Sequence, residues 1–172
     1  MNDLRNLLLE KMKEKGLEMN PDKEFFFSPG EKFDFLGFQI SDGTIDISSN
    51  TVRKMKGRIR RSARKIRRWM LEKDAPVMGT ARALIRSFNR TFYGWDSGEF
   101  SWAAWYFSTI TTTRSLHEID LYCQDWIRYI ASGRHIKKNH SLFTYEMMRD
   151  CGYRPLVSEY YKPRGNRLED TT

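Results

Sequence analysis

The sequence has few cysteines and no long apolar run, and both absences restrict the class of protein. Its 172 residues include two cysteines, Cys123 and Cys151, which have no metal-ligand spacing with each other or with the three histidines. This spacing predicts no metal site, and we interpret the two as thiols of a reducing cytosol, with a disulfide left open. No apolar run approaches the ~18 residues that a membrane span needs. The N-terminus also lacks a signal-peptide pattern, so we expect a cytoplasmic protein without a membrane partner.

Acidic residues are absent from one long basic segment, and this absence indicates the kind of partner. The chain has a formal net charge of +8, and the sixteen residues from Arg53 to Arg68 contain ten basic and no acidic residues. Apolar residues recur there every three or four positions, which predicts a helix from Thr51 to about Glu72. Like charges repel at i,i+4 spacing, so this helix loses stability unless an anion lies against it. The predicted phosphate-binding residues are Arg53, Lys54, Lys56, Arg58, Arg60, Arg61, Arg64, Lys65, Arg67 and Arg68.

Other interpretations of the basic segment remain open at this point. It is also compatible with a solvated face that has no partner, or with a helix on an acidic membrane surface. Gly57 interrupts the helix at a cost of ~1 kcal/mol relative to alanine; it either allows close approach of a backbone or is a tolerated surface glycine. Further candidate phosphate-binding residues recur every four positions on the next predicted helix: Arg82, Arg86 and Arg90. Arg134, Lys137 and Lys138 either extend this surface or form a mobile basic loop.

The remaining patterns predict an α+β fold that is mostly α. An N-terminal helix, a β-hairpin turning at Pro29-Gly30 and a further strand are followed by a helical bundle. The expected elements are helices 3–15, 51–72, 80–93, 100–110 and 115–131, a short helix after Thr144, and extended runs 24–28, 33–40 and 44–47. A capping box from Ser115 to Glu118 is expected to open the fifth of these helices. Aromatic residues between Phe88 and Phe107 fall at helical spacing and predict core packing rather than base stacking, with Trp95 a candidate for exposure.

The stretch GLEMNPDKEFFFSPGEKFDFLGFQI resembles the reverse transcriptase palm beyond its catalytic aspartates, as in group II intron-type and related bacterial retroelement enzymes. The first matching pattern is Gly16, Leu17, Asn20 and Lys23; the second is Phe35, Leu36, Gly37 and Phe38. The basic helix then stands where the thumb begins in that family, and GYRPLVSEYY resembles the C-terminal end of some bacterial members. The resemblance implies three segments: the end of the palm (1–48), a helical thumb-like domain (49–162) and a flexible tail (163–172).

The resemblance also implies roles for individual residues. Lys23 would lie near the phosphates of the incoming nucleotide, as an auxiliary catalytic group, and Phe35, Leu36, Gly37 and Phe38 would support the primer's 3′ end. From the residues alone, we interpret Phe33, Phe35 and Phe38 as the inward face of a strand, whereas Gly37 either marks a bulge or serves the primer end.

The sequence departs from the family in one respect that matters for catalysis. The carboxylates that hold two divalent ions in such polymerases lie upstream of the matched region, and no Asp-Asp pair occurs here. We therefore expect no cofactor in this chain, Mg²⁺ in a missing catalytic part, and no polymerisation by the chain alone. The expected partners are RNA, an RNA–DNA or DNA duplex, and a palm and fingers segment in the same product or a separate chain.

Three hypotheses remain at this point. The chain is the nucleic-acid-gripping end of an RNA-directed DNA polymerase, or it is a stand-alone, non-catalytic RNA-binding module derived from a thumb. A third is an interaction domain whose basic helix binds an acidic protein.

Overall fold

The computed structural model describes residues 2–18, 20, 25, 27–28, 30–94 and 101–162. The chain divides into two compact units, Met1–Glu31 and Lys32–Thr172, and each is described by itself. The expected α+β, mostly α fold class is confirmed, because the helical residues of the described chain far outnumber the residues of one three-stranded sheet. Lys23, Trp95 and the tail 163–172 lie outside the described residues.

The first unit contains helix α1, Asn2–Glu14. The helix ends as predicted at Gly16, whose φ of +66° suits the left-handed closing position. Leu7 and Leu8 lie on its surface at 51% and 56% exposure. The extended run expected at 24–28 is not found: none of its described residues belongs to a strand.

The sheet of the second unit is antiparallel, in the order β1 (Phe33–Phe35), β2 (Phe38–Ser41) and β3 (Thr44–Ile47). Its first turn is Leu36-Gly37, with φ of +49° and +88°. A turn is also present at the expected earlier position, since the Glu31 amide donates to the Ser28 carbonyl at 2.9 Å and Gly30 has a φ of +83°. The hairpin of the sheet does not turn there, however, and that part of the prediction was wrong. The second turn, Asp42-Gly43, lies between the extended runs expected at 33–40 and 44–47. Positive φ at both central residues gives the turn type that matches the twist of a hairpin, and leucine is an unusual residue for it.

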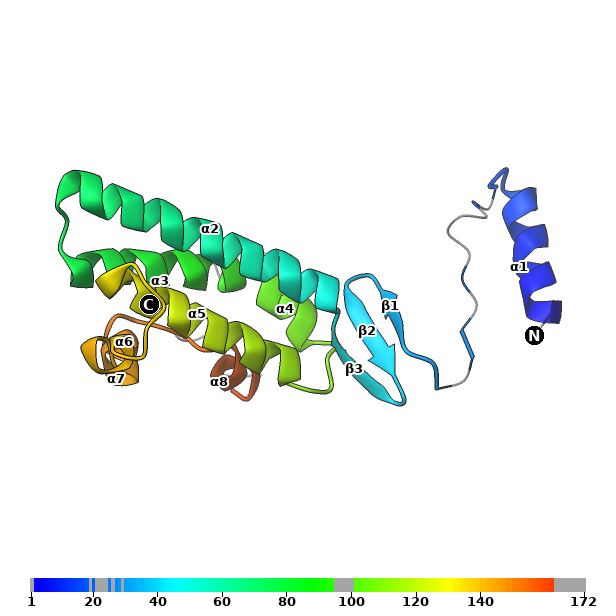
Figure 1. Cartoon of the computed structure of the whole chain (residues 1–172). Coiled ribbons are helices and arrows are strands. Elements are labelled where there is room, and N and C mark those ends of the chain that lie inside the picture. The colour runs from blue at the N-terminus through cyan, green and yellow to red at the C-terminus, as the bar shows by residue number, and fades with distance from the viewer. Residues whose placement is uncertain are drawn as a thin grey trace. The chain divides into compact units, whose positions relative to one another are not determined.

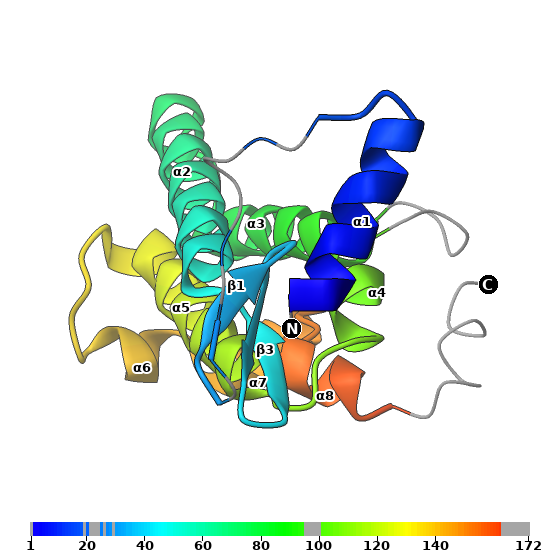
Figure 2. The same ribbon diagram turned by 90° about the vertical axis from the view of Figure 1, so that its right-hand side faces the viewer.

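Three long helices form the body of the second unit. They are α2 (Ser49–Lys73), α3 (Val77–Tyr93) and α5 (Arg114–Ser132), and they lie lengthwise along one another with the sheet at one end (Figure 1). Figure 2 looks along this bundle from the sheet. The shorter helices are α4 (Trp102–Phe107), α6 (Asn139–Leu142), α7 (Tyr145–Asp150) and α8 (Leu156–Tyr160).

Helix α2 begins directly after the sheet, and its first turn is fixed to the hairpin. The Ser48 side chain accepts a hydrogen bond from the Thr51 amide and so caps the helix, an interaction for which serine is one of the favoured residues. The Ser48 amide in turn donates to the Gly37 carbonyl at 2.8 Å. The buried stripe of the helix comprises Val52, Met55, Ile59, Ala63 and Met70. Because this stripe packs into the core, the basic residues are left on the other faces of α2.

Helix α5 departs from its predicted start. Thr113 occupies the N-cap position, so the capping box expected at Ser115 is wrong. Ser115 is instead buried and donates to the Ile47 carbonyl at 3.3 Å, while Glu118 pairs with Lys56 on α2. The polar side chains of Ser115 and Glu118, which the sequence pattern assigned to a cap, are thus bound by the sheet and by α2 instead.

Asp120 is the polar anchor of the core. Its carboxylate accepts hydrogen bonds from the amides of Leu156 and Val157, at 2.8 and 3.0 Å, and from the Tyr153 hydroxyl at 3.1 Å. Burial raises the pKa of this carboxyl, and the three hydrogen bonds oppose the rise. Asp120 therefore caps α8, a helix that the sequence did not predict.

The described residues also bear on the cysteines and on a possible membrane span. Cys123 and Cys151 are both buried and free. Within the ranges given above, no helix combines the length and the apolarity that a membrane crossing requires.

Candidate nucleic-acid interface

The basic residues of α2 form a long cationic face. Eight of the ten are exposed, and Lys56 and Arg67 are half-buried. In the described part of the chain, these ten side chains make a single ion pair, Lys56 with Glu118 at 2.6 Å. At 1.5 Å per residue, the stretch from Arg53 to Arg68 is about 22 Å long. Nine unneutralised cations along this length create a field that attracts a polyanion.

The flank of this face next to α5 is ordered by cation–π contacts. The pairs are Lys56 with Tyr122, Arg64 with Trp126 and Arg67 with Tyr129, at 5.1, 5.8 and 5.3 Å from the ring centres. Residue numbers increase along both helices from the first pair to the third, so α2 and α5 run parallel here. Such contacts contribute ~0.5–1 kcal/mol each at exposed sites, so part of the cationic face also holds α5 against α2.

Arg67 is the cation most involved in packing. Its guanidinium covers Gly133, which closes α5 with a φ of +71°, and any side chain at Gly133 would overlap it. Its Nε atom is buried and has no hydrogen-bond partner among the described residues.

A first groove lies between the sheet and the N-terminal ends of α2 and α5, and we call it the sheet-side groove. Its volume is about 490 Å³. The charged residues that line it are Lys32, Asp46, Arg53, Lys56, Arg60, Arg114 and Glu118, so five cations face two acids. Gly57 also lines it, and a Cβ there would meet only the mobile end of Arg61, at 3.3 Å. The groove is therefore cationic and open to the backbone of α2.

A second groove, the α2–α3 groove, lies on the other flank of α2. It has a volume of about 800 Å³ and is lined by four cations, Lys65, Arg86, Arg90 and Arg154, together with the rings of Trp69 and Tyr93. No acidic residue is among the described residues that line it. Arg82 is exposed on α3 but does not line this groove.

The hairpin residues divide between surface and core. Phe38 is buried against Tyr106, with ring centres 5.1 Å apart, and Phe33 is half-buried. Phe35, at 60% exposure, lies on the surface, so its predicted inward orientation was wrong. Phe35 ends an edge strand, next to Leu36, which is 67% exposed. The two residues form an apolar tip on the hairpin.

Gly37 is required by packing. A Cβ at this position would lie 2.7 Å from the Tyr106 hydroxyl and 3.2 Å from the Thr51 hydroxyl. Together with its positive φ, this contact explains the glycine without a ligand.

Several residues of the two grooves carried no signal in the sequence. Lys32, Arg114 and Arg154 are single cations in mixed segments, and Trp69 follows the helical spacing of the apolar residues of α2, which is typical of a core residue. Only the packing of α3, α5 and the C-terminal segment around α2 brings them to the cationic face. Arg134, Lys137 and Lys138 are exposed beyond the end of α5 and line neither groove.

No family model matches this chain. No curated protein and no solved structure matches it either.

Proposed function

We propose that this chain grips double-stranded nucleic acid by its phosphates, as the C-terminal palm and thumb part of an RNA-directed DNA polymerase. The observation that carries the proposal is the cationic face of α2, where nine of ten basic residues lack an ion-pair partner among the described residues. Arginine dominates this face, and its planar fork suits bidentate contact with phosphate. A face that repels itself in the free chain is stabilised when a polyanion lies along it.

The sheet-side groove gives the duplex a second point of contact. Arg53 and Arg60 line it from α2, Lys32 lines it from the residue before β1, and Arg114 lines it from the start of α5. Gly57 between them leaves the helix backbone accessible to a sugar-phosphate chain. The exposed tip at Phe35 and Leu36 is suited to support the end of a strand, the role that the family resemblance implies for it.

Catalysis in this proposal comes from another segment. Among the described residues, no group of three or more His, Cys, Asp or Glu side chains is placed to hold a metal ion, so no step is assigned to Mg²⁺ on this chain. The exposed Leu7 and Leu8 of α1 are available to be covered by a palm. A stand-alone RNA-binding module would use the same cationic face, and only restored synthesis separates the two.

Duplex binding by charge-matched variants tests the proposal. We expect Arg53→Gln with Arg60→Gln to weaken binding to a blunt RNA–DNA hybrid and to lower the slope of log affinity against log salt by about 0.9 for each phosphate that is no longer neutralised. Arg149→Gln is the control, because Arg149 is exposed on α7 and lines neither groove. Binding to an acidic protein with no binding to the hybrid would overturn the proposal.

Addition of a reverse transcriptase palm and fingers segment in trans tests the enzymatic part. DNA synthesis that requires both chains supports the polymerase, whereas duplex binding without any restored synthesis supports the stand-alone module.

A further inference from the structure

We propose that the α2–α3 groove binds an unpaired stretch of nucleic acid, with a base stacked on Trp69 and the adjacent phosphates held by Lys65 and Arg86. This inference deepens the proposed function, because it gives a single strand next to the gripped duplex a path of its own. It uses residues outside the sheet-side groove, so the two proposals can fail separately.

Trp69 offers an open aromatic face. It is 48% exposed, and in the ranges that the structure describes no other ring packs against it. Trp102 and Trp126, in contrast, pack against Tyr106 and Tyr129, with ring centres 4.6 and 4.8 Å apart. An exposed indole beside cations is the arrangement with which proteins bind unpaired bases without sequence preference.

The charge of the groove favours phosphate. Lys65 lies one helical turn before Trp69 on α2, and Arg86 faces them from α3. Neither cation has an ion pair within the described chain. Because no acidic residue is among the described residues of this lining, Lys65 and Arg86 keep their charge toward a ligand.

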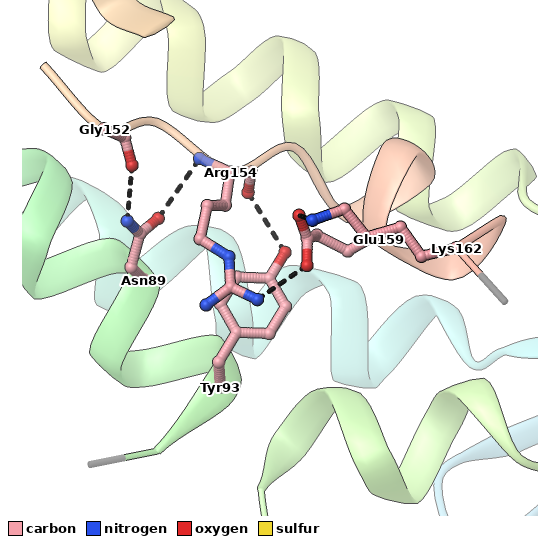
Figure 3. Close-up of polar contacts among 6 residues, drawn as sticks. All are labelled: Asn89, Tyr93, Gly152, Arg154, Glu159 and Lys162. Carbon is pink, nitrogen blue, oxygen red and sulfur yellow. Dashed lines mark hydrogen bonds and ion pairs between the residues drawn. The ribbon is translucent and has the colours of Figure 1, made fainter. Parts of the chain in front are cut away.

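The far wall of the groove is held by hydrogen bonds, which Figure 3 shows. The Asn89 side chain donates to the Gly152 carbonyl at 2.7 Å and accepts from the Arg154 amide at 3.4 Å. The Tyr93 hydroxyl donates to the Arg154 carbonyl at 3.0 Å. These three bonds fix the C-terminal segment on α3, so the wall does not have to be ordered by a ligand.

The same wall explains why Trp69 is the stacking ring. The Arg154 guanidinium lies 4.4 Å from the centre of the Tyr93 ring and also pairs with Glu159 at 2.6 Å. One face of Tyr93 is therefore already covered, and the charge of Arg154 is partly neutralised. This leaves Trp69 for the base and Lys65 and Arg86 for the phosphates.

The cations alone would attract an acidic peptide as well as a nucleic acid. The exposed indole among them favours a ligand that combines flat rings with negative charges. The groove volume of about 800 Å³ is within the range of ~300–1,000 Å³ typical of sites that bury a small molecule. A flat base with its phosphates fits both the ring and the charge.

The test compares a blunt RNA–DNA hybrid with the same hybrid carrying a single-stranded oligothymidine extension, by fluorescence anisotropy at fixed salt. We expect the extension to raise the affinity of the wild-type chain. Trp69→Ala should reduce affinity for the extended hybrid by roughly five- to a hundredfold, the change that corresponds to a stacking energy of ~1–3 kcal/mol, but not below the affinity for the blunt one. Trp69→Phe should keep most of the gain, because it keeps a ring.

Leu71→Ala is the matched control, since Leu71 is exposed on α2 at 62% but does not line the groove. A thermal melt of each variant shows whether it is folded. If Trp69→Ala proves unfolded, Lys65→Gln with Arg86→Gln replaces it, and the loss must again be confined to the extended hybrid.

The outcomes separate the two proposals. Equal effects of Trp69→Ala on both hybrids, or no effect on either, overturn the inference and leave duplex gripping intact. Absence of binding to the blunt hybrid, with binding to free oligothymidine that depends on Trp69, overturns duplex gripping and supports the inference. A polyglutamate peptide that binds more tightly than oligothymidine, with the same dependence on Trp69, overturns the assignment to nucleic acid.

Discussion

Arg61 should oppose stability in the free chain and promote binding in the complex. On α2 it has three cationic neighbours at helical spacing: Arg58 at i−3, Arg64 at i+3 and Lys65 at i+4. Each like-charge pair costs about 0.2–0.5 kcal/mol in an exposed helix at low salt. Arg61→Gln removes all three, so we expect the free energy of unfolding to rise by about 0.6–1.5 kcal/mol. The same change should lower the slope of log affinity against log salt by about 0.9.

Urea unfolding at low ionic strength, followed by circular dichroism, measures the first quantity, and hybrid binding across a salt series measures the second. The stability gain should shrink as salt is added, because these charges are exposed and screened. Arg149→Gln is the control: Arg149 lies three residues after Glu146 on α7 and should give neither a gain in stability nor a change in slope. A loss of stability in Arg61→Gln at low salt would refute the argument from like-charge repulsion. An unchanged slope would refute the assignment of Arg61 to a phosphate.

Three further predictions concern the scaffold of the site. Gly57→Ala should raise the free energy of unfolding by up to ~1 kcal/mol, because only the flexible end of Arg61 is near the new methyl group; weaker hybrid binding by this stabilised variant would show that the helix backbone is contacted. Gly37→Ala should destabilise the chain by at least ~1 kcal/mol, since it combines strain at φ +88° with a clash against Tyr106. Tyr106→Phe should restore part of that stability in urea unfolding, and no restoration would argue against the clash. Burial raises the pKa of the Glu159 carboxyl, but hydrogen bonds from Arg154 and Lys162 outweigh it and hold the pKa below its ordinary value of 4.5. The stability that this carboxylate contributes is therefore fully present above pH 4.5 and is lost as the pH falls through the lower pKa of the folded chain. The free energy of unfolding of Glu159→Gln should accordingly depend less on pH in that window.

The long helices could be predicted because each carries its own periodic apolar stripe. The stripe of α2 and its Ser48 cap are local features, and the structure has both. Helix α8 could not be predicted in this way: the groups that hold its first turn belong to Asp120, 36 residues earlier in the chain. The Leu36-Gly37 turn was missed for a different reason, because leucine rarely adopts positive φ and Pro29-Gly30 is a stronger turn signal.

The candidate site shows the same limit. The density of cations on α2 is visible in the sequence, since ten basic residues without an acid exceed what a solvated face needs. The sequence does not show which of these cations faces which neighbour. In the structure, Arg67 packs on α5, Arg53 and Arg60 line the sheet-side groove, and Lys65 lines the α2–α3 groove. This division depends on which helix flanks each side of α2, which no local pattern encodes.

The salt dependence of wild-type binding to a blunt RNA–DNA hybrid tests the central claim most directly. If the cationic face of α2 grips phosphates, log affinity should fall linearly with log salt, by about 0.9 for each phosphate contacted, with little preference for sequence. Absence of binding at low salt, or an affinity that does not change with salt, would contradict the account.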